Sequence, residues 1–280
     1  TPDCAAVALS TAVGTVVHTG DFGIEYVPVA GRRSDLPALA RLGDRGVRLL
    51  LADSTNAEER PAPSPLPTRP GHGELSRIFA TARGRVLVTT FSSHIHRVQQ
   101  VLNAAYLDGR VVALLGRSLT RNVKMASNLA DPDAPTPGTT YLTPPPGTLV
   151  SLKEMETHPR DEQVLICTGS QGEPRAALAR IAEDNHPHIV LEKGDTAIFS
   201  SRVIPGNETL IFDLQNLLAT RGIRVITEKD HFVHVSGHPC RDELAAMYQW
   251  IRPQVSVPVH GEARHLAEHA AFARELQVPE

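Results

Sequence analysis

The feature that most constrains the fold of this chain is a repeated alternation of apolar, strand-like runs with helix-like segments. The strand-like runs in the middle of the chain are residues 84–93, 110–116, 163–167, 196–201 and 224–227. Strands that are joined through helices cross over the sheet and pair in parallel. We therefore expect an α/β protein with mostly parallel sheets, in which residues that follow the strands meet at one edge.

Composition limits the class of protein. The 280 residues, 41% of them hydrophobic, suffice for one large domain or two intertwined ones. No apolar run is long enough to cross a membrane, so we expect no membrane association. The three cysteines (Cys4, Cys167 and Cys240) are scattered and odd in number, which predicts no disulfide framework and favours a cytoplasmic location. The net charge of −3 argues against a nonspecific nucleic-acid coat, but it leaves room for a local basic groove.

Polar side chains follow the strand-like runs at six places along the chain. These places are His18 with Asp21, Asp53 with Ser54, Ser92 with Ser93, Ser170 with Gln171, His234 with His238, and His260. In open α/β sheets, ligands bind at the carboxyl ends of the strands. Six such groups predict one site assembled from many strand ends.

Two of these residues are candidate metal ligands. Asp21 follows the strand-like run in "VVHTGDF", where a carboxylate could bind a metal or cap a turn. His260 ends the run "VPVHGE", and a neutral imidazole there could be a metal ligand or an ordinary hydrogen-bonded histidine. Both readings stay open for each residue when it is taken alone.

The stretch "HVSGH", residues 234–238, has a more specific pattern. Gly237 allows the backbone to approach a ligand closely, Ser236 offers a hydroxyl, and a helix is expected to follow. Such a helix start, flanked by His234 and His238, suits a phosphate. The alternative is that Ser236 caps the helix and both histidines are solvated.

Two further strand-to-helix turns are candidate phosphate contacts. In "TGSQGEP", Ser170 and Gly172 lie in a glycine-rich turn that could bind an anion, although the pattern taken alone favours an ordinary strand-to-helix turn. In "TTFSSHIHRVQQ", hydroxyls and basic side chains gather at a helix start, which suits a phosphate backbone or a solvated, capped helix. The candidates in this second turn are Ser92, Ser93, His96 and Arg97.

Nine segments match one family in order: "VVHTGDF", "PVAGRRSDL", "LLLADSTNAE", "TTFSSHIHRVQQ", "LLGRSLTRN", "LICTGSQGEP", "VIPGNE", "HVSGH" and "VPVHGE". With them, almost the whole chain resembles the metallo-β-lactamase nucleases of the β-CASP group, and within that group its bacterial ribonuclease J branch. The resemblance implies a metallo-β-lactamase αββα sandwich, present in part, with an inserted β-CASP α/β domain. We place the lactamase-like part at residues 1–62 and 229–280, and the β-CASP domain at residues 63–228.

The resemblance also assigns roles to residues. It implies that Asp21 bridges two divalent metal ions, zinc and/or manganese, and that His260 ligates one of them. Asp53 matches an acidic motif residue, and His238 matches the histidine that donates a proton to the leaving oxygen. The positions lining a phosphate pocket of the RNA channel match Ser170, His234 and Ser236.

One departure from the family pattern is large. The run of the form His-x-His-x-Asp-His, and a further histidine ligand, find no match in this chain. We therefore expect an internal segment of a longer enzyme, which supplies only part of the metal coordination. Asp21 and His260 should nevertheless lie within about 5 Å of each other, because ligand bonds of about 2 Å converge on shared ions.

The function that the resemblance implies is metal-dependent hydrolysis of RNA. We expect 5′-to-3′ exonuclease and endonuclease action in RNA processing and decay, a preference for a 5′ monophosphate, and a homodimer of the full-length protein. The alternative is a non-catalytic β-CASP scaffold that binds RNA. A lactamase-like hydrolase of small molecules is the weaker third reading, because it would not need the inserted domain.

Overall fold

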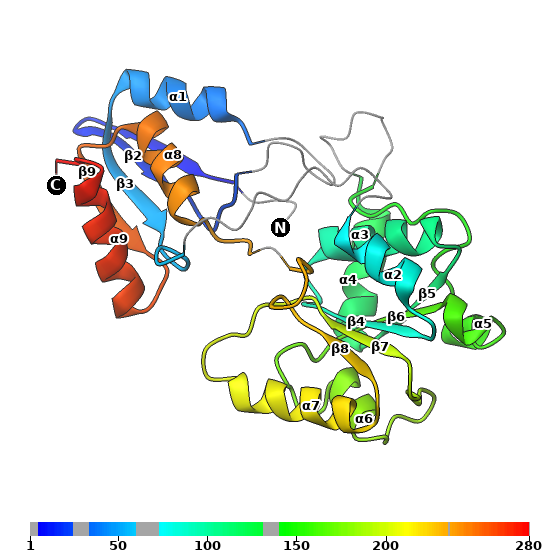
Figure 1. Ribbon diagram of the computed structural model, residues 1–280. Helices are drawn as coiled ribbons and strands as arrows, with labels where there is room; N and C mark the ends of the chain where they lie inside the picture. The colour runs from blue at the N-terminus through cyan, green and yellow to red at the C-terminus, as the bar shows by residue number, and fades with distance from the viewer. Residues whose placement is uncertain (1–4, 25–33, 60–72, 131–139, 235, 280) are drawn as a thin grey trace. The chain divides into compact units, whose positions relative to one another are not determined.

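The chain was analysed as a computed structural model that describes all residues except 1–4, 25–33, 60–72, 131–139, 235 and 280. Its outer segments form one compact unit and its middle forms another (Figure 1). Of the described residues, the first unit comprises 5–24, 34–59 and 236–279, and the second comprises 73–130 and 140–234. Each unit has its own sheet and core, and each is described by itself. No helix in the described ranges is long and apolar enough to span a membrane.

The first unit is built on a four-stranded sheet of order β1-β2-β3-β9. Its strands are β1 (Val7–Thr11), β2 (Gly14–His18), β3 (Val47–Asp53) and β9 (Val255–Val259). β1 and β2 form an antiparallel hairpin, whereas β2, β3 and β9 run parallel. The parallel pairing brings the carboxyl ends of three strands, which come from distant parts of the chain, to one edge.

The described residues of this unit also form the helices α1 (Leu36–Arg45), α8 (Arg241–Ile251) and α9 (Ala263–Glu275). The buried core joins Leu50 and Ala52 of β3 to Leu244 and Ile251 of α8 and to Phe272 of α9. These aliphatic side chains alternate along β3, so the strand presents one face to the helices.

Gly43 lies inside helix α1 and does not end it. The helix continues to Arg45 and is capped by Gly46, whose positive φ of 88° suits a glycine. Gly43 serves packing instead, because a Cβ there would lie 2.0 Å from the carbonyl oxygen of Trp250 in α8. A glycine inside this helix therefore allows α1 and α8 to approach closely.

The second unit contains a five-stranded, fully parallel sheet of order β5-β6-β4-β7-β8. Its strands are β4 (Val86–Thr89), β5 (Val111–Leu115), β6 (Gln163–Cys167), β7 (Thr196–Phe199) and β8 (Arg224–Ile226). The first strand of this sheet in the sequence, β4, lies at its centre. β5 and β6 lie on one side of it, and β7 and β8 lie on the other. Such an order places a crevice at the carboxyl ends of the central strands, where ligands bind in this class of sheet.

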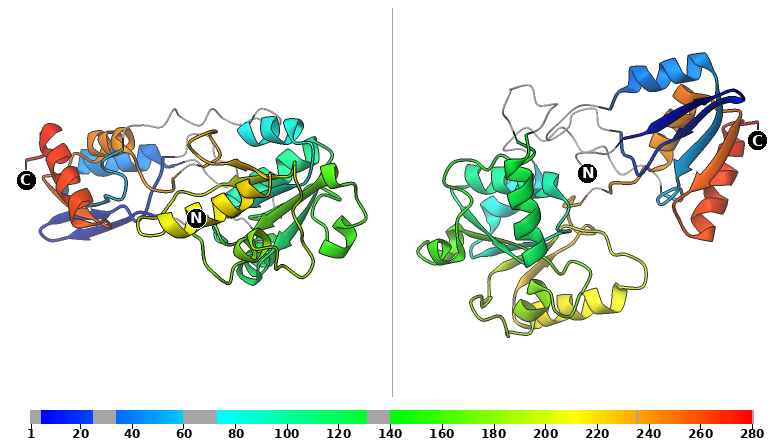
Figure 2. Two further views of the ribbon diagram at one scale, coloured as in Figure 1. Left: turned by 60° about the horizontal axis from the view of Figure 1, so that its bottom comes forward. Right: turned by 180° about the vertical axis from the view of Figure 1, so that it is seen from behind.

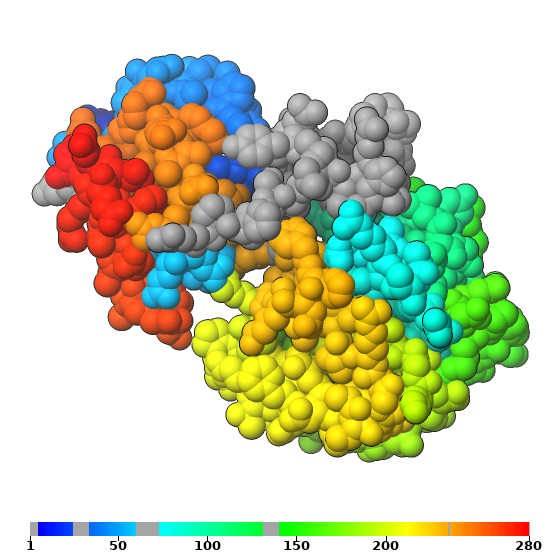
Figure 3. All heavy atoms as spheres, in the orientation of Figure 1, coloured from blue at the N-terminus to red at the C-terminus, as the bar shows by residue number. Residues whose placement is uncertain are grey.

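Helices cover both faces of this sheet (Figures 1 and 2). One buried cluster joins the sheet to α2 (Glu74–Thr81), α3 (Ile95–Leu107) and α4 (Arg117–Asn128). The other face packs on the short α5 (Leu152–Met155), α6 (Ala177–Ala182) and α7 (Glu208–Thr220), with a 3₁₀ turn at Arg160–Glu162. The outer side of α7 faces solvent (Figure 3). The mixed α/β, metallo-β-lactamase-related fold class expected from the sequence is confirmed.

Candidate active site

The candidate active site of the first unit lies where β2, β3 and β9 end. Asp53 is the last residue of β3, His260 directly follows β9, and Asp21 lies three residues beyond β2. The strand ends are held in register by hydrogen bonds: Ser54 N–H donates to the Val259 carbonyl at 2.9 Å. Parallel pairing thus converts three distant sequence positions into one group of side chains.

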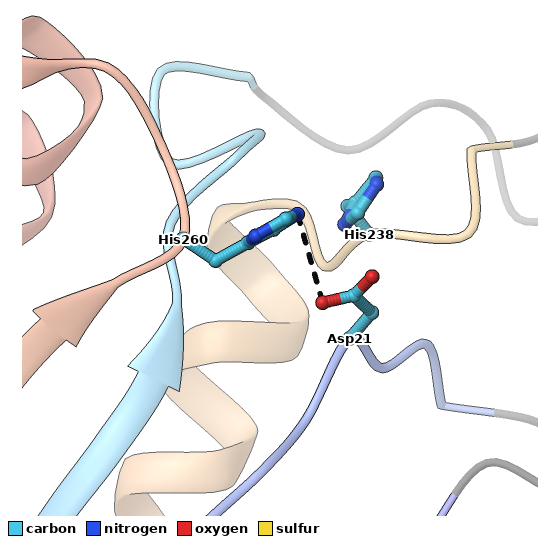
Figure 4. Close-up of side chains that lie close together, drawn as sticks. All are labelled: Asp21, His238 and His260. Atoms are coloured by element: carbon cyan, nitrogen blue, oxygen red, sulfur yellow. Dashed lines mark ion pairs between the residues drawn. The ribbon is translucent and has the colours of Figure 1, made fainter.

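Asp21 and His260 face each other in this group (Figure 4). Asp21 Oδ1 lies 3.6 Å from His260 Nε2, which confirms the expected separation. His238 joins them, and the three residues each offer a ligand atom within 4.8 Å of the others. Among the residues that the structure describes, this is the one group of histidine, cysteine and acidic side chains with such convergence.

The donor set of this group fits a divalent metal ion. One carboxylate oxygen and two imidazole nitrogens are ligands that zinc and manganese both accept. More than half of the Asp21 and His260 side chains is exposed, so an ion and a substrate oxygen have access. Asp21 and His260 are the candidate ligands, and the imidazole of His238 lies beside them.

His238 is held from behind by a buried carboxylate. Its Nδ1 lies 2.7 Å from Oδ2 of Asp53, whose side chain is fully buried. Thr55 donates to Oδ1 of Asp53 from its backbone N–H at 3.0 Å and from its hydroxyl at 2.9 Å. Burial raises the pKa of Asp53, but the bonds from His238 and Thr55 outweigh it, and the net pKa is lowered. Asp53 therefore stays ionised and orients His238, which leaves Nε2 for chemistry.

The loop that carries His238 is held by a residue that the sequence did not single out. Asn56 Nδ2 donates to Ser236 Oγ at 2.8 Å and to the His238 carbonyl at 3.0 Å. Ser236 Oγ also accepts from the His238 backbone N–H. Ser236 does not cap the next helix, because α8 begins at Arg241 with Cys240 as its cap. Asn56 follows Asp53 by three residues, and that proximity was the available signal.

Gly237 lies beside open space, since a Cβ at this position would have no atom within 4 Å. Packing therefore does not explain this glycine, and the position leaves room for a ligand. Residues 231–234, which precede this glycine, form no strand. The backbone before "HVSGH" is therefore an irregular connection.

A second residue that the sequence did not single out is His269 in α9. It is fully buried, with Nδ1 at 2.8 Å from Ser54 Oγ and Nε2 at 2.8 Å from Tyr248 Oη. Tyr248 Oη in turn contacts Ser256 Oγ at 2.6 Å. Ser54 is adjacent to Asp53, so this buried chain of hydrogen bonds supports the end of β3 from inside the unit.

The second unit gathers basic side chains at the carboxyl ends of its central strands. Arg97 extends from α3 and is 6% exposed, and its Nε has no hydrogen-bond partner in the described part of the chain. Burial lowers the pKa of its guanidinium to about 10, so the group is still charged at neutral pH. A buried donor without a partner costs free energy, and an anion bound at Nε would offset that cost.

Two histidines lie close to this guanidinium. The rings of His94 and His234 meet edge to face with centroids 6.2 Å apart. Burial, followed by the charge of Arg97, lowers the pKa of His94 to about 3 and that of His234 to about 4. Both rings are therefore neutral at pH 7. Thr90 at the end of β4 adds a buried hydroxyl that has no partner among the described residues. The cluster suits an oxyanion.

The other predicted phosphate contacts of this unit are distributed differently. Ser92 and Ser93 lie in the turn before α3, and His96 is half-buried within the helix. Ser170 is buried, and its carbonyl accepts from Ser201 Oγ at 3.5 Å. Gly172 serves packing, because its φ is +78° and a Cβ would lie 2.5 Å from that of Leu210.

Two family models match this chain. One, described as "Ribonuclease J, beta-CASP domain", matches residues 83–218. The other, described as "Zn-dependent metallo-hydrolase RNA specificity domain", matches residues 222–279. Together with the fold, they place the chain in the class of metallo-β-lactamase-related hydrolases that carry a β-CASP domain.

Curated relatives narrow this class to a family. A "Ribonuclease J" from Sinorhizobium meliloti is 44% identical over 99% of this chain and 47% of its own length. The one from Mycolicibacterium smegmatis is 43% identical over 99% of this chain and 48% of its own length. The chain belongs to the ribonuclease J family. It spans about half the length of the curated relatives that it matches.

A solved structure shares the fold. It is titled "Crystal Structure of a Protein of Unknown Function from Enterococcus faecalis V583" and matches with a TM-score of 0.54 at 14% identity. The match covers 91% of this chain and 55% of that one.

Proposed function

We propose that this chain is the catalytic part of a metal-dependent ribonuclease that hydrolyses RNA phosphodiester bonds. The observation that carries the proposal is the convergence of Asp21, His238 and His260, with Asp53 holding His238 from behind. The names of the relatives and the described RNA specificity of the second family model support the choice of RNA as substrate.

We assign Asp21 and His260 as ligands of divalent metal ions. Asp21 has two carboxylate oxygens, which suits it to bridge two ions, zinc and/or manganese. Such ions would activate water and neutralise charge on a phosphodiester. The described residues offer one convergent group of candidate ligands.

We assign His238 as the proton donor to the leaving oxygen. The ionised Asp53 accepts from Nδ1–H and thereby stabilises the protonated imidazole, while Nε2 remains directed at the reacting group. Asp53 acts through His238 by fixing its orientation. The stacking of His238 on His260, with ring centroids 5.3 Å apart, holds the imidazole at the metal ligands.

The polar cluster of the second unit is proposed to contact RNA phosphates. Arg97 supplies a fixed cation, and His234 and Ser170 supply neutral contacts in the same unit. Within the first unit, Ser236 is proposed separately to contact an RNA phosphate. We propose that the protein prefers a 5′ monophosphate and acts as a 5′-to-3′ exonuclease, and as an endonuclease on RNA without a free end. A homodimer in the cytoplasm, acting in RNA processing and decay, completes the proposal.

The test uses the full-length protein that contains this chain. Linear 5′-monophosphorylated, linear 5′-triphosphorylated and circular RNA are offered to the wild type, with and without chelator, and to His238→Ala. We expect cleavage of the monophosphorylated and circular RNA that a chelator abolishes and that His238→Ala slows by roughly 10²–10⁴-fold, with RNA affinity retained.

The matched control is His265→Ala, because His265 lies on α9 outside the cluster. Its rate should equal that of the wild type. RNA binding without any cleavage in the wild type would show that the protein is a scaffold. Loss of binding at an unchanged rate constant would show that His238 is a binding residue.

A further inference from the structure

The second unit contains a groove that the proposed chemistry does not use. Its volume is about 790 Å³, within the range of ligand sites, and one wall is α4. The floor is the end of edge strand β5 with Leu152 of α5, and the facing wall is formed by residues 186–188. Arg97 and the buried histidines near it do not line this space. We call it the α4 groove.

Three cations line one side of the α4 groove. Arg117, Arg121 and Lys124 project from α4 at helical spacing i, i+4, i+7 and are exposed. They extend over about 10 Å of the helix axis. Among the described residues, none of the three has a carboxylate partner. A chain with a net charge of −3 thus concentrates positive charge along one helix face.

This arrangement works against the stability of α4. Arg117 occupies the first turn, which contains no acidic residue, although the positive end of the helix dipole lies there. Arg121 is a like charge one turn further along, which also disfavours the helix. Helix stability therefore does not account for these cations, whereas binding of an anionic ligand does.

The facing side of the α4 groove carries two imidazole rings. His186 and His188 meet edge to face with centroids 6.3 Å apart. Burial, then the charges of Arg180 and His188, lowers the pKa of His186, so this ring is neutral at pH 7. Met125, which is 51% exposed, adds an apolar surface within the groove. Bases can stack on imidazole rings and on guanidinium planes.

We propose that the α4 groove binds single-stranded RNA, with phosphates along Arg117, Arg121 and Lys124 and bases against His186 and His188. A strand with anionic phosphates on one side and flat, uncharged bases on the other matches a cationic helix face and a side that offers rings for stacking. The groove holds RNA and takes no part in the bond cleavage. The inference rests on the proposed function for its choice of RNA.

The test measures RNA binding by the full-length protein in EDTA, where cleavage is absent. The probes are two fluorescent single-stranded RNAs, one of 4 nucleotides and one of about 20 nucleotides. The longer RNA exceeds the length that one single-strand binding site covers. In Arg121→Glu with Lys124→Glu, we expect affinity for the longer RNA to fall at least ~10-fold. The slope of log K against log salt should decrease by about 1.4, from two lost phosphate contacts.

Two further variants make the result specific. The matched control is Arg77→Glu with Arg83→Glu, which makes the same change of charge at two exposed positions. Arg77 lies in helix α2 and Arg83 lies two residues beyond its end. This control should leave the affinity for RNA within about twofold of the wild type. His186→Ala with His188→Ala should weaken binding of the longer RNA roughly 10-fold with an unchanged salt slope, because stacking carries no charge.

Equal losses in the α2 control and the α4 variant would overturn the inference, since a general field would then explain the binding. Unchanged RNA affinity in the α4 variant would also overturn the inference. A lower molar mass of the α4 variant in light scattering would overturn it too, because the groove would then join two copies of the protein. The proposed function is judged separately on cleavage of the 4-nucleotide RNA with metal present, which the α4 variant should leave unchanged.

Discussion

Replacing His269 by leucine tests whether a buried hydrogen-bonded chain supports the active-site edge of the first unit. Ser54 Oγ donates to the Ala52 carbonyl at 3.3 Å, and that carbonyl can only accept. Ser54 therefore accepts from Nδ1–H of His269, while Nε2 accepts from Tyr248. The neutral tautomer satisfies both ring nitrogens, and leucine satisfies neither partner.

The expected loss of stability is moderate. Two hydrogen bonds disappear, each worth about 0.5–1.5 kcal/mol. Both partners keep another contact, since Ser54 still reaches the Ala52 carbonyl and Tyr248 still reaches Ser256. Leucine fills similar space without a polar atom. We therefore expect His269→Leu to lower the free energy of unfolding by about 2 kcal/mol at pH 7.5.

In acid, the difference in unfolding free energy should change sign, so that His269→Leu becomes more stable than the wild type. Burial lowers the pKa of His269 from 6.5 to about 4, a shift that nearby Asp53 only partly opposes. Between these values the unfolded chain binds a proton that the folded chain does not, so the wild type loses stability as pH falls from 6.5 toward 4. The full shift corresponds to about 3 kcal/mol. Leucine has no such proton, so the two stabilities should cross at about pH 5.

The assay follows Trp250, the single tryptophan of the chain, which lies on α8 of the same unit. Urea unfolding is recorded at pH 7.5, 6.0 and 4.5 for the wild type, His269→Leu and Tyr248→Phe. The Tyr248 variant retains the imidazole and should keep the acid loss of the wild type. A stability difference that is independent of pH in His269→Leu would refute the reasoning, because His269 would then not be held neutral.

Three other changes have expected outcomes. Asp53→Asn should lower the single-turnover rate of RNA cleavage by roughly 10²–10⁴-fold at little cost in RNA affinity, because the amide no longer stabilises the protonated imidazole. Arg97→Met should weaken RNA binding while raising the free energy of unfolding by about 1–3 kcal/mol, since it removes a buried unpaired charge, and urea titration with RNA anisotropy tests both. Gly43→Ala should lower the thermal midpoint, because its Cβ would overlap a backbone oxygen, by more than the control Gly46→Ala, which costs about 1 kcal/mol in open space.

The sequence was sufficient to predict the convergence of Asp21 and His260. Both follow strand-like runs, and parallel pairing brings the carboxyl ends of strands to one edge whatever their separation in sequence. The contact between His238 and Asp53 was less accessible. The end of β3 fixes the position of Asp53. His238 lies in an irregular loop that Asn56 holds by a hydrogen bond, and its role was assigned only through the family resemblance.

Other residues of the site could not be predicted, because burial decides their role. His269 occupies a helix position that periodicity assigns to the core, and nothing in the sequence indicates its two polar partners. Gly43 and Gly172 resemble helix-stop and phosphate-loop glycines, yet both are required by close contacts with a neighbouring helix. Such contacts depend on how elements pack, which local sequence patterns do not record.

The histidines show how environment separates residues of one type into different functions. His269 is enclosed by hydroxyls that need a neutral ring, so protonation there costs stability and the residue is structural. His234 lies near the charge of Arg97, which disfavours a second cation and leaves room for an anion. His238 instead hydrogen-bonds a buried, ionised carboxylate, which favours the protonated imidazole that an acid catalyst needs. The partner of His238 is a fully buried carboxylate, whereas Glu74 and Glu162, the partners of His231 and His158, are partly exposed.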